Sequence, residues 1–176
     1  MTSFGRRPKT QPQDLIKSAQ FGIITIGIGA TSNTAIIAPV DTTQALLNHL
    51  QSRGTLSFAS QRCVRLELTN PTTITGTRHS SLFTIHAAYC IIEFDAAIKS
   101  NQRGLVFLDA VLSNTANITA VDITKALLVH LGQSCSQGGH HRCCSTLELT
   151  NQTTVTAERG DALGEVVASF QVLEFK

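Results

Sequence analysis

Nearly the same sequence occurs twice in this chain, and this repeat constrains the fold more than any other feature. When residues 32–94 are aligned with residues 113–175, at a constant shift of 81, 27 of the 63 positions are identical. The longest shared segments are SNTA, ALLxHL and LELTNxTT, and both copies end in Glu-Phe. Chance does not produce such agreement over so many positions, so the sequence predicts a tandem duplication of one module.

The repeat divides the 176 residues into two predicted modules, at 21–98 and 99–176, after an N-terminal arm at 1–20. A module of this size is near the lower limit for a self-sufficient core, so we expect the modules to lean on each other or on neighbouring chains. The arm is polar and holds the basic residues Arg6, Arg7 and Lys9. We expect an extended assembly arm that orders on a neighbouring subunit, with a disordered tail as the alternative.

Each module has the pattern of a series of short strands. Stretches rich in Ile, Val, Thr and Leu, bounded by turn-forming residues, are typical of strands. In the first module these stretches are Ile23–Ile28, Thr34–Pro39, Val64–Thr69, Thr72–Thr77 and Thr84–Phe94.

Alternation within the strands predicts which faces are buried. In the last strand every second residue is apolar, and this predicted core face comprises Ile85, Ala87, Tyr89 and Ile91, with Val166, Ala168, Phe170 and Val172 in the second module. Leu66 and Leu68 are predicted to point inward, with Glu67 pointing out.

The segment Asp41–Leu50 is open to two interpretations. Its residues have good helix propensity, and a helix would end near Gly54. In the second module the matching segment is followed at once by Gly132, which leaves room for about two turns, and an isolated helix of that length is marginal. We therefore predict a strand. The fold class is then all-β, with two tandem antiparallel β-sandwich modules of about six strands each.

The chain is weakly charged. Only 15% of its residues are charged, and the formal net charge is +2, whereas typical domains are about 25% charged. So small a net charge does not predict nucleic-acid binding. No apolar run approaches the ~18 residues of a membrane span, and the leading segment lacks the apolar stretch of a secretory signal. A Thr-rich surface with few charges favours an assembly subunit whose faces contact other protein.

The order of the motifs resembles that of a known class of modules. A Ser-Asn-Thr-Ala strand is followed by Val-Asp-Thr-Thr-x-Ala-Leu-Leu, a variable loop, Leu-Glu-Leu-Thr-Asn-x-Thr-Thr-x-Thr-x-x-Arg and a last strand ending in Glu-Phe. Over about residues 20–176, this pattern resembles β-sandwich modules in virion proteins of tailed bacteriophages, of the collar or neck, decoration and tail-fibre kind. The resemblance implies a structural or adhesive role in the virion, in a symmetric ring or fibre.

We therefore expect a non-enzymatic structural protein of a tailed-phage particle, in the neck or collar or as head decoration. It is expected to form a homo-oligomer and to contact other virion proteins, without a cofactor and without direct contact with nucleic acid or membrane. The alternative is a fibre or adhesin-type module that binds host-surface glycan. Such a module needs an exposed aromatic platform, whereas the chain has no Trp and its single Tyr89 lies on a predicted core face.

Five cysteines are candidates for disulfide bonds, namely Cys63, Cys90, Cys135, Cys143 and Cys144. An odd number leaves at least one thiol without a partner in the same chain. Cys135 and Cys143 flank a short loop, so they could meet across the mouth of a hairpin. Disulfides that mature in the oxidising exterior after particle release would lock neighbouring subunits together. The alternative for Cys63 and Cys90 is that they are small core residues.

Cys135, His140 and His141 are weak candidates for a metal site. Cys and His are ligands that zinc prefers, but adjacent residues on a strand point to opposite faces, and the first module has no counterparts of these residues. We therefore predict no metal site here, and a loop that lies at an interface. His49 and His130 recur at one position, which favours a shared packing or hydrogen-bonding niche because no nucleophile motif accompanies them.

Other catalytic patterns are missing from the sequence. It has no phosphate-binding glycine loop and no G-x-S-x-G motif. Glu67 and Glu148 are predicted to pair with Arg65, Arg78 or Arg159 rather than to act in acid–base catalysis. A hydrolase is therefore the least favoured class, and we predict that the chain is not an enzyme.

Overall fold

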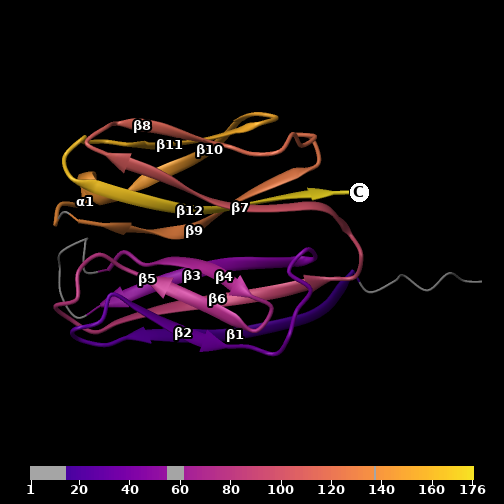
Figure 1. The fold of residues 1–176 in the computed structure, drawn as a ribbon, viewed down its shortest axis with the longest axis horizontal. Coiled ribbons are helices and arrows are strands. Elements are labelled where there is room, and N and C mark those ends of the chain that lie inside the picture. The colour runs from indigo at the N-terminus through magenta and orange to yellow at the C-terminus, as the bar shows by residue number, and fades with distance from the viewer. Residues whose placement is uncertain (1–14, 55–61, 137) are drawn as a thin grey trace, which may run out of the picture.

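Strands make up nearly all the regular structure in the computed structural model, which describes residues 15–54, 62–136 and 138–176 (Figure 1). The first half contains β1 (Ile16–Ile26), β2 (Ser32–Ile36), β3 (Ala45–Gly54), β4 (Arg65–Asn70), β5 (Thr73–Thr77) and β6 (Ile85–Phe94). The second half contains β7 (Ile98–Asp109), β8 (Ser113–Asn117), β9 (Ala126–Cys135), β10 (Ser145–Asn151), β11 (Thr154–Arg159) and β12 (Glu165–Phe175). A single helical turn, α1 (His140–Cys143), precedes β10. The fold class is all-β, as predicted.

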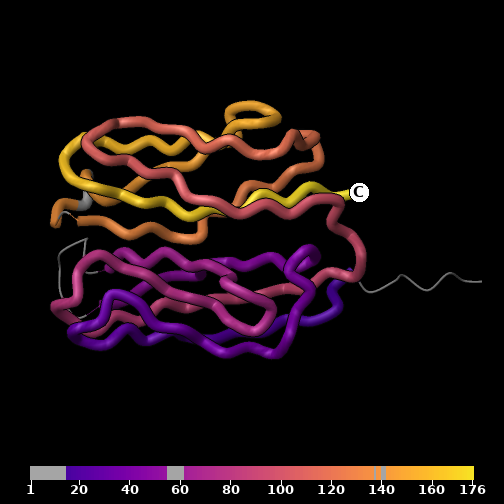
Figure 2. The backbone as a smooth tube through the Cα atoms, viewed as in Figure 1, coloured from indigo at the N-terminus to yellow at the C-terminus, as the bar shows by residue number. Residues whose placement is uncertain are grey.

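The strands form antiparallel sheets that stack as sandwiches. β1, β6 and β3 form one sheet in that order, and β10, β11 and β8 form another. A third sheet runs β2-β5-β4-β9-β12-β7, and its two halves are joined by one residue pair, Arg65 with Gly132. Figure 1 shows β7, β9 and β12 lying between the first half of the chain and the layer of β8, β10 and β11. The backbone tube in Figure 2 has the same layering.

Strand pairing follows the sequence repeat. Ser32 pairs with Thr77 across β2 and β5, and Ser113 pairs with Glu158, the residue 81 positions after Thr77, across β8 and β11. The pairings of β3 with β6 and of β9 with β12 each contain one register shift. Corresponding strands therefore have corresponding partners in the two halves, while the duplication itself stays a prediction from the sequence.

One apolar core is centred on each half, with Leu131 of β9 contributing to the first, and the predicted core faces are confirmed. The buried residues include Ile85, Ala87, Tyr89 and Ile91 in the first half and Val166, Ala168, Phe170 and Val172 in the second. Leu66 and Leu68 are buried, whereas 40% of the Glu67 side chain is exposed. The large rings fit because they lie over glycines: a Cβ at Gly22 would overlap the Tyr89 ring, and one at Gly104 would overlap Phe170.

Residues 45–50 of the contested segment Asp41–Leu50 lie in strand β3, as predicted, whereas residues 41–44 form a turn before it. Its helix propensity is outweighed because β3 pairs with β6 along its whole length and buries Ala45 and Leu47.

The predicted arm is too long. Strand β1 begins at Ile16, so residues 16–20 belong to the first sheet. The signal was in the sequence: Ile16-Lys17-Ser18-x-Gln20-x-Gly22 returns as Ile98-Lys99-Ser100-x-Gln102-x-Gly104. The shift here is 82 instead of 81, so an alignment with a constant shift of 81 misses it. Arg6, Arg7 and Lys9 lie outside the described residues.

Candidate functional site: two equivalent sheet faces

The outer face of the β7–β12–β9 sheet is covered by the first half of the chain. We call it the closed face and define it by Asn101, Arg103, Ser169, Gln171 and Leu173. The three β12 residues point away from the core of the second half and yet are at most 2% exposed. They are buried because β12 contacts β3 and β4, the strands at one side of the first sandwich.

Gln171 caps the edge of β3. Its Oε1 accepts a hydrogen bond from the Leu47 N–H at 2.9 Å, and its Nε2 donates to the Ala45 carbonyl at 2.8 Å. The same Nε2 donates to Oδ1 of Asn101 at 2.8 Å, which fixes the orientation of the amide. A buried edge strand with unpaired backbone groups is unfavourable, so this side chain replaces the strand partner that β3 lacks on this side.

Three further side chains of the closed face complete the cap. Asn101 and Arg103 donate to the Ala45 carbonyl at 2.9 and 2.8 Å. Ser169 Oγ donates to the carbonyl of Leu66, on β4, at 3.0 Å. The closed face therefore provides hydrogen-bond partners for backbone groups of both sheets of the first sandwich. With these partners, the edges of β3 and β4 can be buried.

The equivalent face of the β1–β6–β3 sheet is apolar and exposed. We call it the open face and define it by three rows across the strands, Ala19–Ile92–Leu46, Phe21–Cys90–Asn48 and Ile23–Ala88–Gln51. Phe21 is 71% exposed and Ile23 is 60% exposed. These rows contain no charged side chain. Contiguous apolar surface of this kind marks interaction sites on soluble proteins.

The two faces differ at the positions that make the cap. The shift is 82 in β1 and β7 and 81 in β6 and β12, so Ala19 corresponds to Asn101, Phe21 to Arg103, Ala88 to Ser169 and Cys90 to Gln171. Each polar side chain that bonds to an edge strand thus has a less polar counterpart on the open face. Sequence reasoning missed this difference because it compared the identities between the repeats and not their substitutions.

In each half, a buried carboxylate joins the start of one long strand to the loop that precedes another. Glu93 accepts hydrogen bonds from Lys17 Nζ at 2.7 Å, Ser18 Oγ at 3.2 Å and the Asp41 N–H at 3.1 Å. Glu174 has the corresponding partners in the second half. Burial raises the pKa of Glu93, but the hydrogen bonds from Lys17, Asp41 and Ser18 together outweigh it and lower the pKa below its usual value. Both glutamates are therefore anionic structural anchors near neutral pH.

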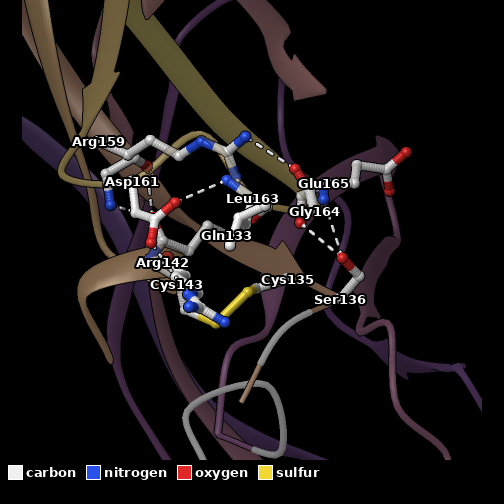
Figure 3. The surroundings of a disulfide bond; sticks show 11 residues. Gln133, Cys135, Ser136, Arg142, Cys143, Arg159, Asp161, Leu163, Gly164 and Glu165 are labelled. Atoms are coloured by element: carbon white, nitrogen blue, oxygen red, sulfur yellow. Dashed lines mark hydrogen bonds and ion pairs between the residues drawn. A yellow bond between two sulfur atoms is a disulfide. The ribbon is translucent and has the colours of Figure 1, made fainter. Parts of the chain in front are cut away.

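One predicted disulfide closes a short loop after β9 (Figure 3). Cys135 and Cys143 are bonded, with their Cα atoms 5.3 Å apart. The loop is held further by an ion pair between Arg142 Nε and Asp161 Oδ2 at 3.0 Å and by a hydrogen bond from Gln133 Nε2 to the Cys143 carbonyl. The hairpin-mouth prediction is confirmed for this pair.

The other three cysteines are free thiols: Cys63 is half-buried, Cys90 buried and Cys144 exposed. The metal candidate Cys135 is unsuitable as a ligand because its sulfur is in the disulfide. His140 and His141 lie in α1, and their side chains are outside the described part of the structure. Within the described residues, no group of three His, Cys, Asp or Glu side chains is placed to hold a metal ion.

The repeated histidines and cysteines meet in one cavity between the halves. His49, His130, Cys63 and Cys144 line a hollow of about 390 Å³. Burial, with His130 nearby, lowers the pKa of His49 to about 4, and burial raises the pKa of Cys63 to about 11. At neutral pH this imidazole is neutral and this thiol is protonated, so they lack the thiolate that a Cys–His nucleophile needs. The repeat predicted that His49 and His130 occupy the same kind of packing or hydrogen-bonding niche in the two modules, but it did not predict that both line one cavity.

Gly132 is required where the two halves join. Its φ of +88° lies in the left-handed region, and a Cβ there would be 2.1 Å from the Val64 carbonyl oxygen. This glycine therefore lets β9 approach β4 closely enough for the Arg65–Gly132 pairing. His130 Nδ1 accepts a hydrogen bond from the Gly132 N–H at 3.0 Å, at the register shift in β9.

The predicted partners of Glu67 are partly confirmed. Arg65 Nη1 lies 2.8 Å from Glu67 Oε2. Arg78 and Arg159 are not the partners of Glu67 and Glu148. Both arginines are buried, and they donate to loop carbonyls, including those of Ala30 and Val111. A guanidinium has several donors, and here they satisfy carbonyls that the turns leave without strand partners.

No helix in the described ranges is both long enough and apolar enough to cross a membrane. The chain matches no protein-family model, and no curated protein or solved structure is significantly similar to it.

Proposed function

We propose that this chain is a structural subunit of a tailed-phage particle, in the neck or collar or as head decoration, and that it acts by binding other protein. The observation that supports this most strongly is the open face. It is a sheet face of ordinary core composition, with Phe21 and Ile23 mostly exposed, and burial of such surface is favourable. The closed face adds support because the corresponding sheet of the second half is buried against protein.

Inter-subunit disulfides are part of this proposal. Cys144 is exposed and has no disulfide partner in the chain, so its thiol is available to a neighbouring subunit. Molecular oxygen outside the host cell would take up the two electrons and two protons that leave when two thiols join. Non-reducing electrophoresis of purified particles is expected to give a dimer band that disappears on reduction. A ladder of monomers alone would remove this part of the proposal.

Fractionation of infected cells tests the location. We expect the chain to co-purify with particles at a fixed ratio to the major capsid protein, and to resist release by washing at high salt because its contacts are apolar. Recovery of the whole pool as free monomer in the soluble host fraction would contradict the proposal. Quantitative mass spectrometry of the gradient fractions gives this ratio directly.

A glycan-binding role is less well supported. Tyr89, the single tyrosine, lies in the core of the first half and is 5% exposed, so it offers no sugar platform. The open face is apolar, whereas sugar recognition combines an aromatic ring with polar groups that satisfy hydroxyls. We expect no specific signal on a glycan array.

A further inference from the structure

We propose that the open face binds the open face of a second copy of this chain, forming a dimer with two-fold symmetry. This inference rests on the assembly function proposed above and names the partner of that surface. Three features of the described residues lead to it: the chemistry that the open face lacks, the absence of charge in its rows, and its relief.

The comparison of the two faces argues against an edge strand as the partner. On the closed face, Gln171, Ser169 and Arg103 bond to backbone groups of the edge strands. At the equivalent positions of the open face, Cys90, Ala88 and Phe21 cannot make these bonds. An edge strand docked as on the closed face would find no partners for its N–H and C=O groups at these three positions, which is unfavourable. A partner whose own backbone groups are already paired, such as a sheet face, avoids this cost.

The charge of the open face fits a copy of itself. Its three rows contain Asn48 and Gln51 as their only polar side chains. Rows without charge meet no repulsion when they are placed against identical rows, and sheet faces with this composition pack about 10 Å apart in sandwiches. The flanking row, Thr25–His86–Arg53, carries one cation, Arg53. Two-fold pairing also closes the assembly at two copies, because each copy uses the same patch.

The open face carries both a protruding side chain and a hollow that a second copy can fill. Phe21, in the middle row, is largely exposed, and a hollow of about 210 Å³ lies over Ala88, in the next row. The hollow is lined by Ile23, Gln51, Ser52, Arg53, His86 and Ala88. A two-fold axis places the Phe21 ring of each copy in the hollow of the other. There the Arg53 guanidinium can lie over the ring face, a favourable cation–π arrangement.

The size of the face sets the expected strength. The whole solvent-facing side of the β1–β6–β3 sheet, of which the open face is the central part, covers roughly 14 Å by 33 Å for strands of about ten residues. That is about 460 Å² for each copy and about 920 Å² in all, which is the size of a weak, transient interface. We therefore expect a dimer with a dissociation constant in the micromolar range, and the measurement must extend to about 500 µM. Sedimentation equilibrium of the full chain, under reducing conditions that exclude disulfide dimers, gives this constant.

Two substitutions test the knob and the hollow separately. Phe21→Thr removes the knob and keeps a residue that suits a strand, and Ala88→Leu fills the hollow. Each variant alone is expected to dimerise at least about tenfold more weakly than the wild type. Phe107→Thr is the matched control: Phe107 is also an exposed phenylalanine on a long strand but lies outside the open face, so its dimer should be unchanged. Circular dichroism and thermal melting verify that each variant is folded.

Mixing the two variants gives the decisive result. In an equimolar mixture, the Phe21 knob of the Ala88→Leu chain fits the intact hollow of the Phe21→Thr chain, so a heterodimer forms more strongly than either homodimer. A mixture that stays as monomeric as its components, or a Phe21→Thr variant that dimerises like the wild type, would overturn the proposal. A wild type that stays monomeric to about 500 µM would overturn it as well.

The outcomes separate this inference from the proposed function. A monomeric wild type that is found in purified particles leaves the structural role standing and assigns the open face to another protein. A wild-type dimer with mixing rescue, from a chain absent from particles, leaves the inference standing and removes the virion role.

Discussion

Single residues decide what each sheet face can bind. Gln171 and Cys90 occupy equivalent places in β12 and β6, and both are almost fully buried. Gln171 reaches across to two backbone groups of β3, whereas a thiol is too short and too weak a donor and acceptor to do so. The sequence pattern predicts that both positions lie in strands. It does not predict what each face binds, because that depends on which element lies opposite.

Replacing Gln171 is expected to weaken the join between the halves. In Gln171→Leu the Leu47 N–H stays buried without an acceptor, so the free energy of unfolding should fall by about 1–3 kcal/mol. Gln152→Leu, in an exposed turn, is the control and should change it by less than about 0.5 kcal/mol. Urea unfolding monitored by circular dichroism measures both. Equal stability of the two variants would show that the cap does not stabilise the fold.

His49 makes stability depend on pH. Its pKa is about 4 in the folded chain, against 6.5 in an unfolded one, so unfolding takes up a proton between these values. Stability should therefore fall as the pH is lowered from 6.5 towards 4. His49→Gln, which cannot take up that proton, should lose less melting temperature between pH 6.5 and pH 5 than the wild type. His79→Gln, at an exposed site, should keep the wild-type slope, and the same loss in all three proteins would contradict the assignment.

The strands could be predicted where the local alternation of apolar and polar residues determines them. Alternation at Ile85, Ala87 and Tyr89 was enough to identify a strand and its buried face, and the short segment before Gly132 was enough to favour a strand over a helix. The start of β1 was missed because the repeat changes its shift by one residue near Ile16. The close approach at Gly132 was missed because it is a contact between elements, and spacing within one element carries no information about it.

The disulfide is expected to stabilise the loop that it closes. Cys135 and Cys143 are eight residues apart, and the chain-entropy model gives about 2.5 kcal/mol for closing a loop of that length. Cys143→Ser should lower the free energy of unfolding by roughly this amount. Cys144→Ser, at the adjacent exposed thiol, should leave it unchanged, and adding reductant should bring the wild type down to the level of Cys143→Ser. Insensitivity of the wild type to reductant would contradict a stabilising bond.

At the scale of the whole molecule, the two halves carry one strand plan and use it differently. In the second half the closed face is buried against the first half, whereas in the first half the equivalent open face is exposed. The repeat predicts the strand plan, and the small size of each module predicts that the halves lean on each other. It does not predict that an edge of one half rests on a face of the other, since that arrangement depends on polar side chains at four positions where the repeats differ.

The most direct test of this account is the concentration dependence of NMR signals from the two faces. In a fully assigned sample under reducing conditions, dilution from about 500 µM to about 20 µM should shift the signals of Phe21, Ile23 and Ala88 together along one binding curve. The signals of Ser169, Gln171 and Leu173 should stay in place because the first half already covers them. Signals that are independent of concentration on the open face, or shifts confined to the closed face, would contradict the central claim.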